Sequence, residues 1–222
     1  MVDISVNNLT KFFVIGENLL QGLSFEIQEG ERVAILGRNG CGKTTLFRIL
    51  MGLETADCGE IRIQNQEEEQ TIRCDGSRQS RLTRTFSRAA EIQKKIRISA
   101  VFQEDRLCEA FSAVDNVLMT AASSMTREQV SEELRSLLPE ESLNRPVFTL
   151  SGGQKRRAAI CRALCAPSDL LILDEPFTGL DPATKSEVIK YLQKKSAGKL
   201  TLLSTHQEED LQALNGTRIT LP

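Results

Sequence analysis

Two glycine-rich stretches of this sequence carry the residue types that bind phosphate groups. The first, GRNGCGKT at residues 37–44, fits the pattern G-x-x-x-x-G-K-[ST] and lies between an apolar strand-like run and a helical pattern, the context that makes it specific. Glycines let backbone N–H groups turn toward phosphate oxygens, Lys43 can neutralise phosphate charge, and the Thr44 hydroxyl can ligate Mg²⁺. The sequence therefore predicts a phosphate-binding loop that contains Gly37, Asn39, Gly40, Cys41, Gly42, Lys43, Thr44 and Thr45.

The second stretch is LSGGQKRR at residues 150–157, which combines two glycines with a hydroxyl and a basic cluster. These are the residue types of another anion-binding loop. Because the first loop is complete by itself, the second one needs a separate ligand.

Two carboxylates, Asp174 and Glu175, stand at the end of the apolar run LLILDEP. In a parallel sheet this strand end lies beside the phosphate-binding loop. Asp174 would then hold Mg²⁺ through its water shell, and Glu175 would polarise the attacking water as general base. Two acids at a strand end are by themselves an ordinary loop start, but a phosphate-binding loop in the same chain favours the functional interpretation.

Gln103 and His206 also follow strand-like runs, ISAVF and LTLLST. Both are expected at the same carboxyl edge of the sheet. We predict that Gln103 is a catalytic group and metal ligand, and that His206 contacts the γ-phosphate. Taken alone, His206 is equally compatible with an ordinary surface residue.

The order of the patterns predicts an α/β fold. Short alternating runs between residues 3 and 27 indicate antiparallel strands, and later strands that alternate with helices indicate a mainly parallel sheet. We therefore predict a P-loop NTPase core with a mainly parallel sheet, an antiparallel β subdomain and a small helical subdomain at about 104–147, all within one domain over 1–222.

The charged stretch 64–97 is the least legible part of the chain. It begins with acidic residues and then carries Arg78, Arg81, Arg84 and Arg88 at helical spacing. A helix here would present an arginine stripe. A solvated helix face is favoured over a surface that binds acidic lipid or a partner, because charge runs on helices usually face water.

The composition narrows the class of protein. The chain has 222 residues, is 40% hydrophobic and has a formal net charge of -2, so it supplies no global positive field for nucleic acid. Neither a secretory signal nor a membrane-spanning apolar run is visible, which predicts a cytoplasmic location. The six cysteines form no CxxC pair, which disfavours zinc and disulfide frameworks.

Five motifs occur in an order that identifies a family. They are GRNGCGKTT, VFQ with Gln103, LSGGQ, LILDEP followed by GLD with Asp181, and STH with His206. LSGGQ is the most diagnostic, because other P-loop proteins lack it. Over nearly its whole length the chain resembles the ATP-binding subunits of the ATP-binding cassette (ABC) superfamily.

The resemblance implies a role for the second glycine-rich stretch. In the family two such domains stack head to tail, and the LSGGQ motif of one closes over the nucleotide held by the other. Ser151, Gly152, Gly153 and Gln154 would thus contact ATP in trans, at a helix N-terminus where the helix dipole favours negative charge. Asp181 would lie at the seam between the two protomers.

Three residues depart from the commoner family pattern. Phe13 replaces a tyrosine and keeps the face that would stack on adenine. Cys41 occupies a position usually held by alanine or serine, and Arg156 stands where many relatives have glutamine. Neither of these two changes removes a phosphate ligand. The stretch 64–97 is longer than in most relatives and inherits no role from the family.

The resemblance implies an ATPase, with ATP and Mg²⁺ as cofactors, that energises a membrane transporter. Its partners would be a second ATP-binding subunit, in a homodimer or heterodimer, and a membrane-spanning subunit reached through the helical subdomain and the Gln103 region. It would be cytoplasmic and peripheral on the inner face of the cell membrane, with no nucleic-acid partner. VFQEDRL resembles importers of nitrate, sulfonate and taurine. The alternatives are a soluble ABC ATPase of an assembly machine, such as iron–sulfur cluster biogenesis, and a less favoured DNA-repair or translation factor.

Overall fold

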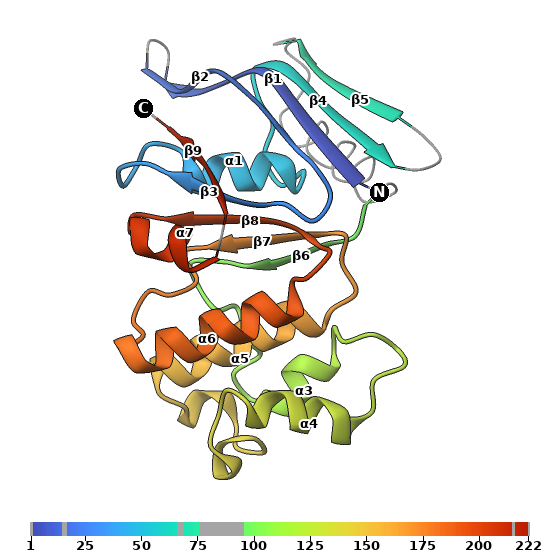
Figure 1. Ribbon diagram of the computed structural model, residues 1–222, viewed down its shortest axis with the longest axis vertical. Helices are drawn as coiled ribbons and strands as arrows, with labels where there is room; N and C mark the ends of the chain where they lie inside the picture. Colours follow the sequence, from blue (N-terminus) through green and yellow to red (C-terminus); the bar gives the residue numbers. More distant parts are fainter. Residues whose placement is uncertain (1, 15–16, 66–68, 76–95, 215, 222) are drawn as a thin grey trace.

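Alternating apolar residues build an antiparallel sheet from the N-terminal part of the chain (Figure 1). The computed structural model describes residues 2–14, 17–65, 69–75, 96–214 and 216–221. Ile4 of the central strand pairs with Ile27 on one side and Ile63 on the other, and all three are buried on one face. The strand order is β2-β1-β4-β5, with β1 (Val2–Val14), β2 (Glu17–Ile27), β4 (Cys58–Asn65) and β5 (Glu69–Asp75).

The strand β5 lies inside the charged stretch 64–97, for which the sequence predicted no strand. It pairs with β4 because Ile72 and Cys74 alternate with polar residues and are buried. The predicted arginine stripe falls outside the described residues.

A parallel sheet forms the centre of the molecule, as predicted. Its strands are almost wholly buried, which matches their continuous apolar sequences. Neighbouring residues point to opposite faces: Ile172 and Leu202 pack with the antiparallel sheet, whereas Leu173 and Leu203 pack with helices. The order is β6-β7-β8-β3-β9, with β3 (Arg32–Leu36), β6 (Ile98–Val101), β7 (Leu170–Asp174), β8 (Leu200–Thr205) and β9 (Thr217–Thr220).

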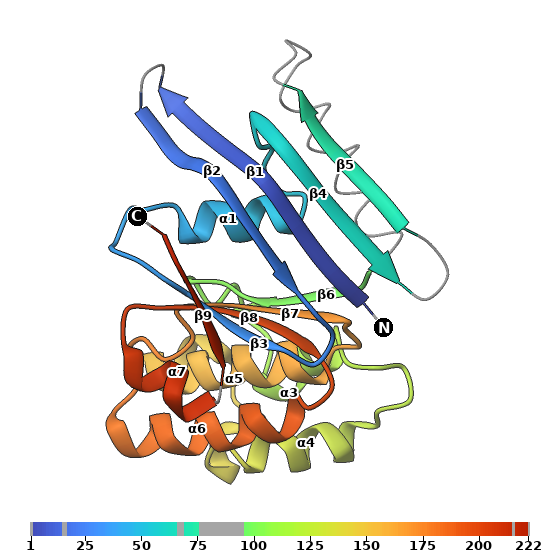
Figure 2. The same ribbon diagram turned by 45° about the horizontal axis from the view of Figure 1, so that its top comes forward.

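Helices cover both faces of the parallel sheet (Figures 1 and 2). The helix α1 (Lys43–Leu50) lies between the two sheets and buries Leu46 and Phe47 there. The helices α5 (Gly152–Cys165) and α6 (Pro182–Lys195) cover the opposite face, and Pro182 stands in the first turn of α6. The helix α7 (Glu208–Leu214) and the strand β9 after it were not predicted.

Two short helices, α3 (Ala113–Leu118) and α4 (Arg127–Arg135), occupy the region predicted as a helical subdomain. The helical conformation is interrupted between these two helices. The reason is local, because Ser112 and Thr126 each begin a new helix with a capping box. Single 3₁₀ turns follow Pro139 and Pro146, at Glu140–Ser142 and Val147–Thr149.

The register of the parallel sheet brings its carboxyl ends to one edge. Leu36 at the end of β3 pairs with Thr205 at the end of β8, and Asp174 at the end of β7 pairs with Ser204. Every predicted catalytic and metal-binding residue lies at the end of one of these strands or in the segment that follows one of them or β6. Within the described part of the chain, no helix is both long and apolar enough to cross a membrane.

Candidate active site

The phosphate-binding loop joins β3 to α1, and it contains glycines at positions where any other residue would be strained. Gly40 and Gly42 have φ angles of 84° and 106°. A Cβ on Gly42 would lie 2.9 Å from a methyl group of Leu20, so close packing also requires glycine there. Lys43 is 6% exposed, and its Nζ donates to the carbonyl of Gly37 at 2.7 Å. The loop thus holds a buried ammonium group at the start of a helix.

A cavity of about 290 Å³ lies over this loop. Next in the loop, the sulfur of Cys41 packs so closely against Gly37 that a Cβ on this glycine would lie 2.5 Å from Sγ. The structure therefore gathers most of the predicted loop residues around one space, which is lined by Leu19, Asn39, Gly40, Gly42, Lys43, Thr44, Thr45, Gln103 and Glu175.

The carboxylate of Asp174 is fixed by two hydroxyl groups. Thr44 Oγ1 donates to Oδ2 at 2.7 Å, and Ser204 Oγ donates to Oδ1 at 2.6 Å. Asp174 is 4% exposed, so this geometry is held in the protein interior. The hydroxyl of Thr44 and the carboxylate are hard oxygen donors side by side, which fits Mg²⁺.

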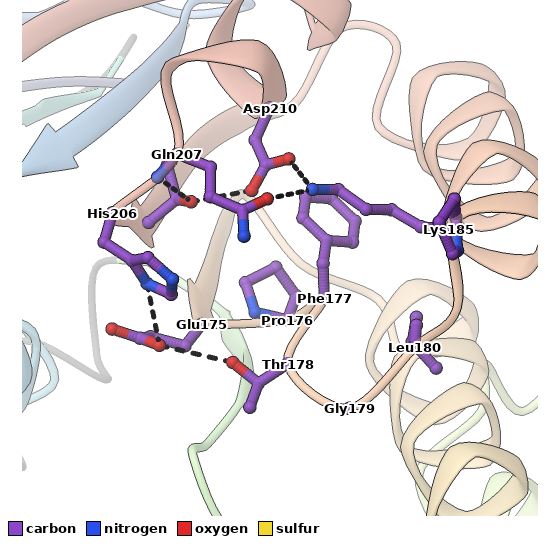
Figure 3. Close-up of a pocket in the computed structure, with 12 residues that line it drawn as sticks. Glu175, Pro176, Phe177, Thr178, Gly179, Leu180, Lys185, His206, Gln207 and Asp210 are labelled. Atoms are coloured by element: carbon purple, nitrogen blue, oxygen red, sulfur yellow. Dashed lines mark hydrogen bonds and ion pairs between the residues drawn. The ribbon is translucent and has the colours of Figure 1, made fainter.

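Glu175 sits in a left-handed backbone conformation, with φ of 48°, directly after the strand. Its N–H donates to Ser204 Oγ at 2.9 Å. Its Oε2 accepts from Thr178 Oγ1 at 3.2 Å (Figure 3). The other carboxylate oxygen lies 3.9 Å from Lys43 Nζ. The carboxylate of Glu175 thus lies beside the buried lysine, and Glu175 lines the cavity, a position that suits a general base.

His206 faces the same carboxylate. Its Nδ1 lies 3.5 Å from Glu175 Oε2, and 53% of the side chain is exposed (Figure 3). The next residue, Gln207, donates its N–H to Thr205 Oγ1, and that hydroxyl donates to the buried Asp210. Lys185 of α6 pairs with Asp210, so this network ties the turn that carries His206 to α6. The network borders a second cavity of about 360 Å³, which Glu175 and His206 also line.

Gln103 is exposed and lines the cavity over the phosphate-binding loop. It also lines a neighbouring cavity of about 170 Å³ together with Thr44 and Asp174. Gln103 therefore borders the region where the sequence predicted a metal ligand. Its backbone carbonyl accepts from Arg156, a buried residue of α5.

The LSGGQ stretch forms the start of α5. Ser151 is the N-cap and exchanges hydrogen bonds with Gln154 in a capping box, and Gly152 is exposed. Among the described residues that line the cavity over the phosphate-binding loop, none belongs to this stretch. The structure therefore does not bring the two glycine-rich stretches together within one chain.

Asp181 begins α6 in a similar way. It is exposed and accepts hydrogen bonds from the N–H and hydroxyl of Thr184, which hold the pKa of its carboxyl below the usual value. The remaining predicted residue, Phe13, lies in β1, and its side chain falls outside the described ones.

Sequence reasoning missed Ser204 and the contacts of Arg156. Ser204 bridges Asp174 and the Glu175 backbone, and the only sequence signal is a small polar residue before the strand end. Arg156 stood out as a departure from the family pattern, but its partners lie more than fifty residues earlier in the chain.

Comparisons with known proteins agree with this arrangement. The ABC transporter family matches residues 20–178. A probable amino-acid ABC transporter ATP-binding protein of Haemophilus influenzae is 35% identical over 211 residues, which cover 92% of this chain and 78% of that protein. The aliphatic sulfonates import ATP-binding protein SsuB 1 of Rhizobium johnstonii is 32% identical over 91% of this chain and 67% of its own length. The spermidine/putrescine import ATP-binding protein PotA of Bacteroides fragilis is 31% identical over 98% of this chain, which spans only 44% of PotA.

Solved structures share the fold. A dimeric ATP-binding cassette in a post-hydrolysis state, bound to ADP and phosphate, superposes with a TM-score of 0.77 and 27% identity, covering 98% of this chain and 94% of that one. A dimeric bacterial ABC transporter cassette gives a TM-score of 0.76 and 28% identity, again over 98% and 94% of the two chains. With its P-loop core, parallel sheet and antiparallel sheet, the chain therefore belongs to the ABC transporter family and is an ATP-binding ATPase cassette of that family.

Proposed function

We propose that this chain hydrolyses ATP between Lys43 and Glu175 and uses the resulting dimer cycle to drive a membrane-spanning transporter subunit. The observation that carries the proposal is the convergence of a buried lysine, a fixed aspartate and a glutamate at one sheet edge. Thr44 Oγ1 and Asp174 Oδ2 are 2.7 Å apart, and Lys43 Nζ and Glu175 Oε1 are 3.9 Å apart.

Each residue of the site has a separate task in this proposal. The N–H groups of the loop and Lys43 bind the phosphates of ATP. Thr44, Asp174 and Gln103 would hold Mg²⁺, which when bound neutralises charge on the phosphates. Glu175 accepts a proton from the attacking water, and Thr178 holds its Oε2 at 3.2 Å. His206 lies beside Glu175 and contacts the γ-phosphate.

The LSGGQ stretch acts on the nucleotide of a second subunit. Ser151 and Gly152 are exposed at the start of a helix of 14 residues, whose dipole favours an anion. Two cassettes arranged head to tail would place this helix start over the partner's ATP, with Asp181 at the seam. That arrangement supplies the ligand that the second glycine-rich stretch lacks within its own chain. The pair is a homodimer or a heterodimer.

The membrane-spanning partner would dock beside the Gln103 segment. An apolar cavity of about 370 Å³ includes Met51, the exposed Leu53 and Phe102, and it adjoins the smaller cavity that Gln103 lines. Apolar surface rimmed by charged side chains is typical of a protein interface. Nucleotide-dependent movement of Gln103 would therefore reach the partner directly.

We further propose that the transporter is an importer and that this chain lies on the cytoplasmic face of the membrane. The sulfonate and spermidine/putrescine relatives support this direction by their names, whereas a Nod factor export ATP-binding protein of Cupriavidus metallidurans is 33% identical over 95% of this chain. Within the chain, the resemblance of VFQEDRL to importers supports import. The proposal also includes a helical subdomain at about residues 104–147.

The test is the Glu175→Gln variant, which keeps the shape of the side chain and removes its basicity. We expect ATP binding to be retained and turnover to fall about 10²- to 10⁴-fold. Unchanged turnover would remove Glu175 from the proposed role. Tagged and expressed in its host, the variant should be recovered with ATP in the membrane fraction with a multi-span subunit. Recovery as a soluble complex without a membrane protein would instead favour an ATPase of an assembly machine.

A further inference from the structure

Arg156 makes an unusual set of contacts for a charged residue. It is 6% exposed, and its guanidinium donates from Nη1 to the carbonyl of Phe102 and from Nη2 to the carbonyl of Gln103, both at 2.7 Å. The same Nη1 lies 3.2 Å from Oδ1 of Asp105. Burial raises the pKa of the Asp105 carboxyl, although the nearby Arg156 acts in the opposite direction. One side chain of α5 thus fixes three positions of the segment that carries Gln103.

A second arginine extends this attachment. Arg162 lies further along α5, and its guanidinium donates to the carbonyls of Asp105 and Arg106 at 2.9 Å and 2.7 Å. Lys155 pairs with Glu109 at 3.0 Å. Three basic residues of α5 therefore hold one face of the segment from Phe102 to Glu109, and Arg156 is the one that reaches Gln103 itself.

The two ends of this attachment belong to different nucleotide sites in the proposed function. Gln103 lines the cavity over the chain's own phosphate-binding loop. Ser151, at the start of α5, would serve the partner's ATP. Because a rigid link joins these two residues, a nucleotide that displaces Gln103 also displaces α5.

We propose that Arg156 is a positioning residue that couples the two ATP sites of the dimer by joining Gln103 to α5. The inference rests on the proposed function and adds a residue that determines how strongly the two ATP sites are coupled. A planar guanidinium is required, because it donates in two directions at once. Lysine offers a single point charge, and the glutamine of many relatives offers one short amide group.

The experiment compares the ATP-driven dimerisation of variants made in the Glu175→Gln background. Light scattering measures dimerisation at a series of ATP concentrations. Arg156→Gln and Arg156→Lys remove the two-way donation. Arg135→Gln is the matched control, because Arg135 also pairs with two carboxylates, Glu132 and Glu140, but lies on the surface. Binding of a fluorescent ATP analogue to the monomer and thermal unfolding are measured for each protein.

We expect the ATP concentration for half-maximal dimerisation to rise about tenfold in Arg156→Gln, which corresponds to about 1.4 kcal/mol. The Hill coefficient should fall toward about 1. Arg156→Lys should show the same change to a smaller degree, with monomer affinity for the analogue unchanged and the control equal to the parent.

Three results would overturn the inference while leaving the proposed function intact. Dimerisation of Arg156→Gln at the parent's ATP concentration is one, and full rescue by Arg156→Lys is another. The third is a loss of monomer affinity for the ATP analogue in Arg156→Gln that is as large as its loss of dimerisation, because this would indicate a merely structural role for Arg156. If Arg156→Gln does not fold, Arg156→Lys decides by the same criteria. Failure of the parent itself to dimerise with ATP would contradict the proposed function, and the inference with it.

Discussion

Ser204 offers the sharpest test of how the active site is held together. Its hydroxyl donates to Asp174 Oδ1 at 2.6 Å and accepts from the N–H of Glu175 at 2.9 Å, and the residue is 0% exposed. Ser204→Ala removes one oxygen atom and both hydrogen bonds. Because Ser204 is not exposed to solvent, water does not replace these hydrogen bonds.

Two effects follow from this loss. A buried polar group left without a partner costs about 1–3 kcal/mol, so the free energy of unfolding should fall by about 2–6 kcal/mol for the two groups together. Glu175 holds a φ of 48°, which costs free energy and depends on surrounding contacts. With its N–H released, the carboxylate should lose its position and kcat should fall about 10- to 100-fold, as for other groups that orient active-site ligands.

The assay is steady-state ATPase kinetics beside denaturant unfolding. Thr201→Ala is the control, because Thr201 is also 0% exposed on β8 but its hydroxyl donates only to the carbonyl of Lys199, at 3.3 Å. The control should lose stability without losing kcat by more than about twofold. If Ser204→Ala and the control lower kcat equally, Ser204 has no positioning role and the reasoning is refuted.

Three further changes probe the loop and the helical region. Lys43→Ala should weaken ATP binding at least about tenfold, because the buried ammonium is lost; normal affinity in a titration would contradict the phosphate-binding loop. A thiol reagent should block ATPase activity through Cys41, and bound ATP should protect; equal inhibition of Cys41→Ala would assign the effect to another cysteine. Hydrogen bonds from Ser112 and then Arg127 lower the pKa of Asp115, so its carboxylate stabilises the fold above its unfolded pKa, and this is lost as pH falls through the folded pKa. Asp115→Asn should therefore lower the free energy of unfolding by about 1 kcal/mol at about pH 7 and by progressively less as the pH falls through the folded pKa of Asp115, and a loss that does not change with pH would contradict this account.

The sequence predicted the residues of the sheet edge because each follows an apolar strand, and parallel strands end together. The prediction for Asp174 and Glu175 required only this rule and the presence of the phosphate-binding loop. Ser204 was not predictable in the same way, since its role depends on the register that pairs it with Asp174. A serine in a buried strand has no sequence pattern that reveals such a partner.

The later elements illustrate the same limit. Glu208–Leu214 and Thr217–Thr220 are short and largely polar, so neither shows a clear period, and tertiary contacts decide their structure. The strand β9 forms because β3 offers a free edge, with Leu36 paired to Thr220. Arg156 was visible as an unusual residue, but only the fold brings the Gln103 segment against it.

Ser151 and Asp181 show why predicted contacts with a partner need careful tests. Each caps a helix within its own chain, so loss of either side chain would weaken α5 or α6 whether or not a partner is present. Gly152 separates the two roles. A Cβ there meets nothing within 4 Å, and its backbone needs no left-handed conformation. Gly152→Ala should therefore leave the free energy of unfolding within about 0.5 kcal/mol of the parent, yet hinder ATP-driven dimerisation by filling the surface that faces the partner's phosphate. Dimerisation at the parent's ATP concentration would show that this helix start does not approach a nucleotide closely.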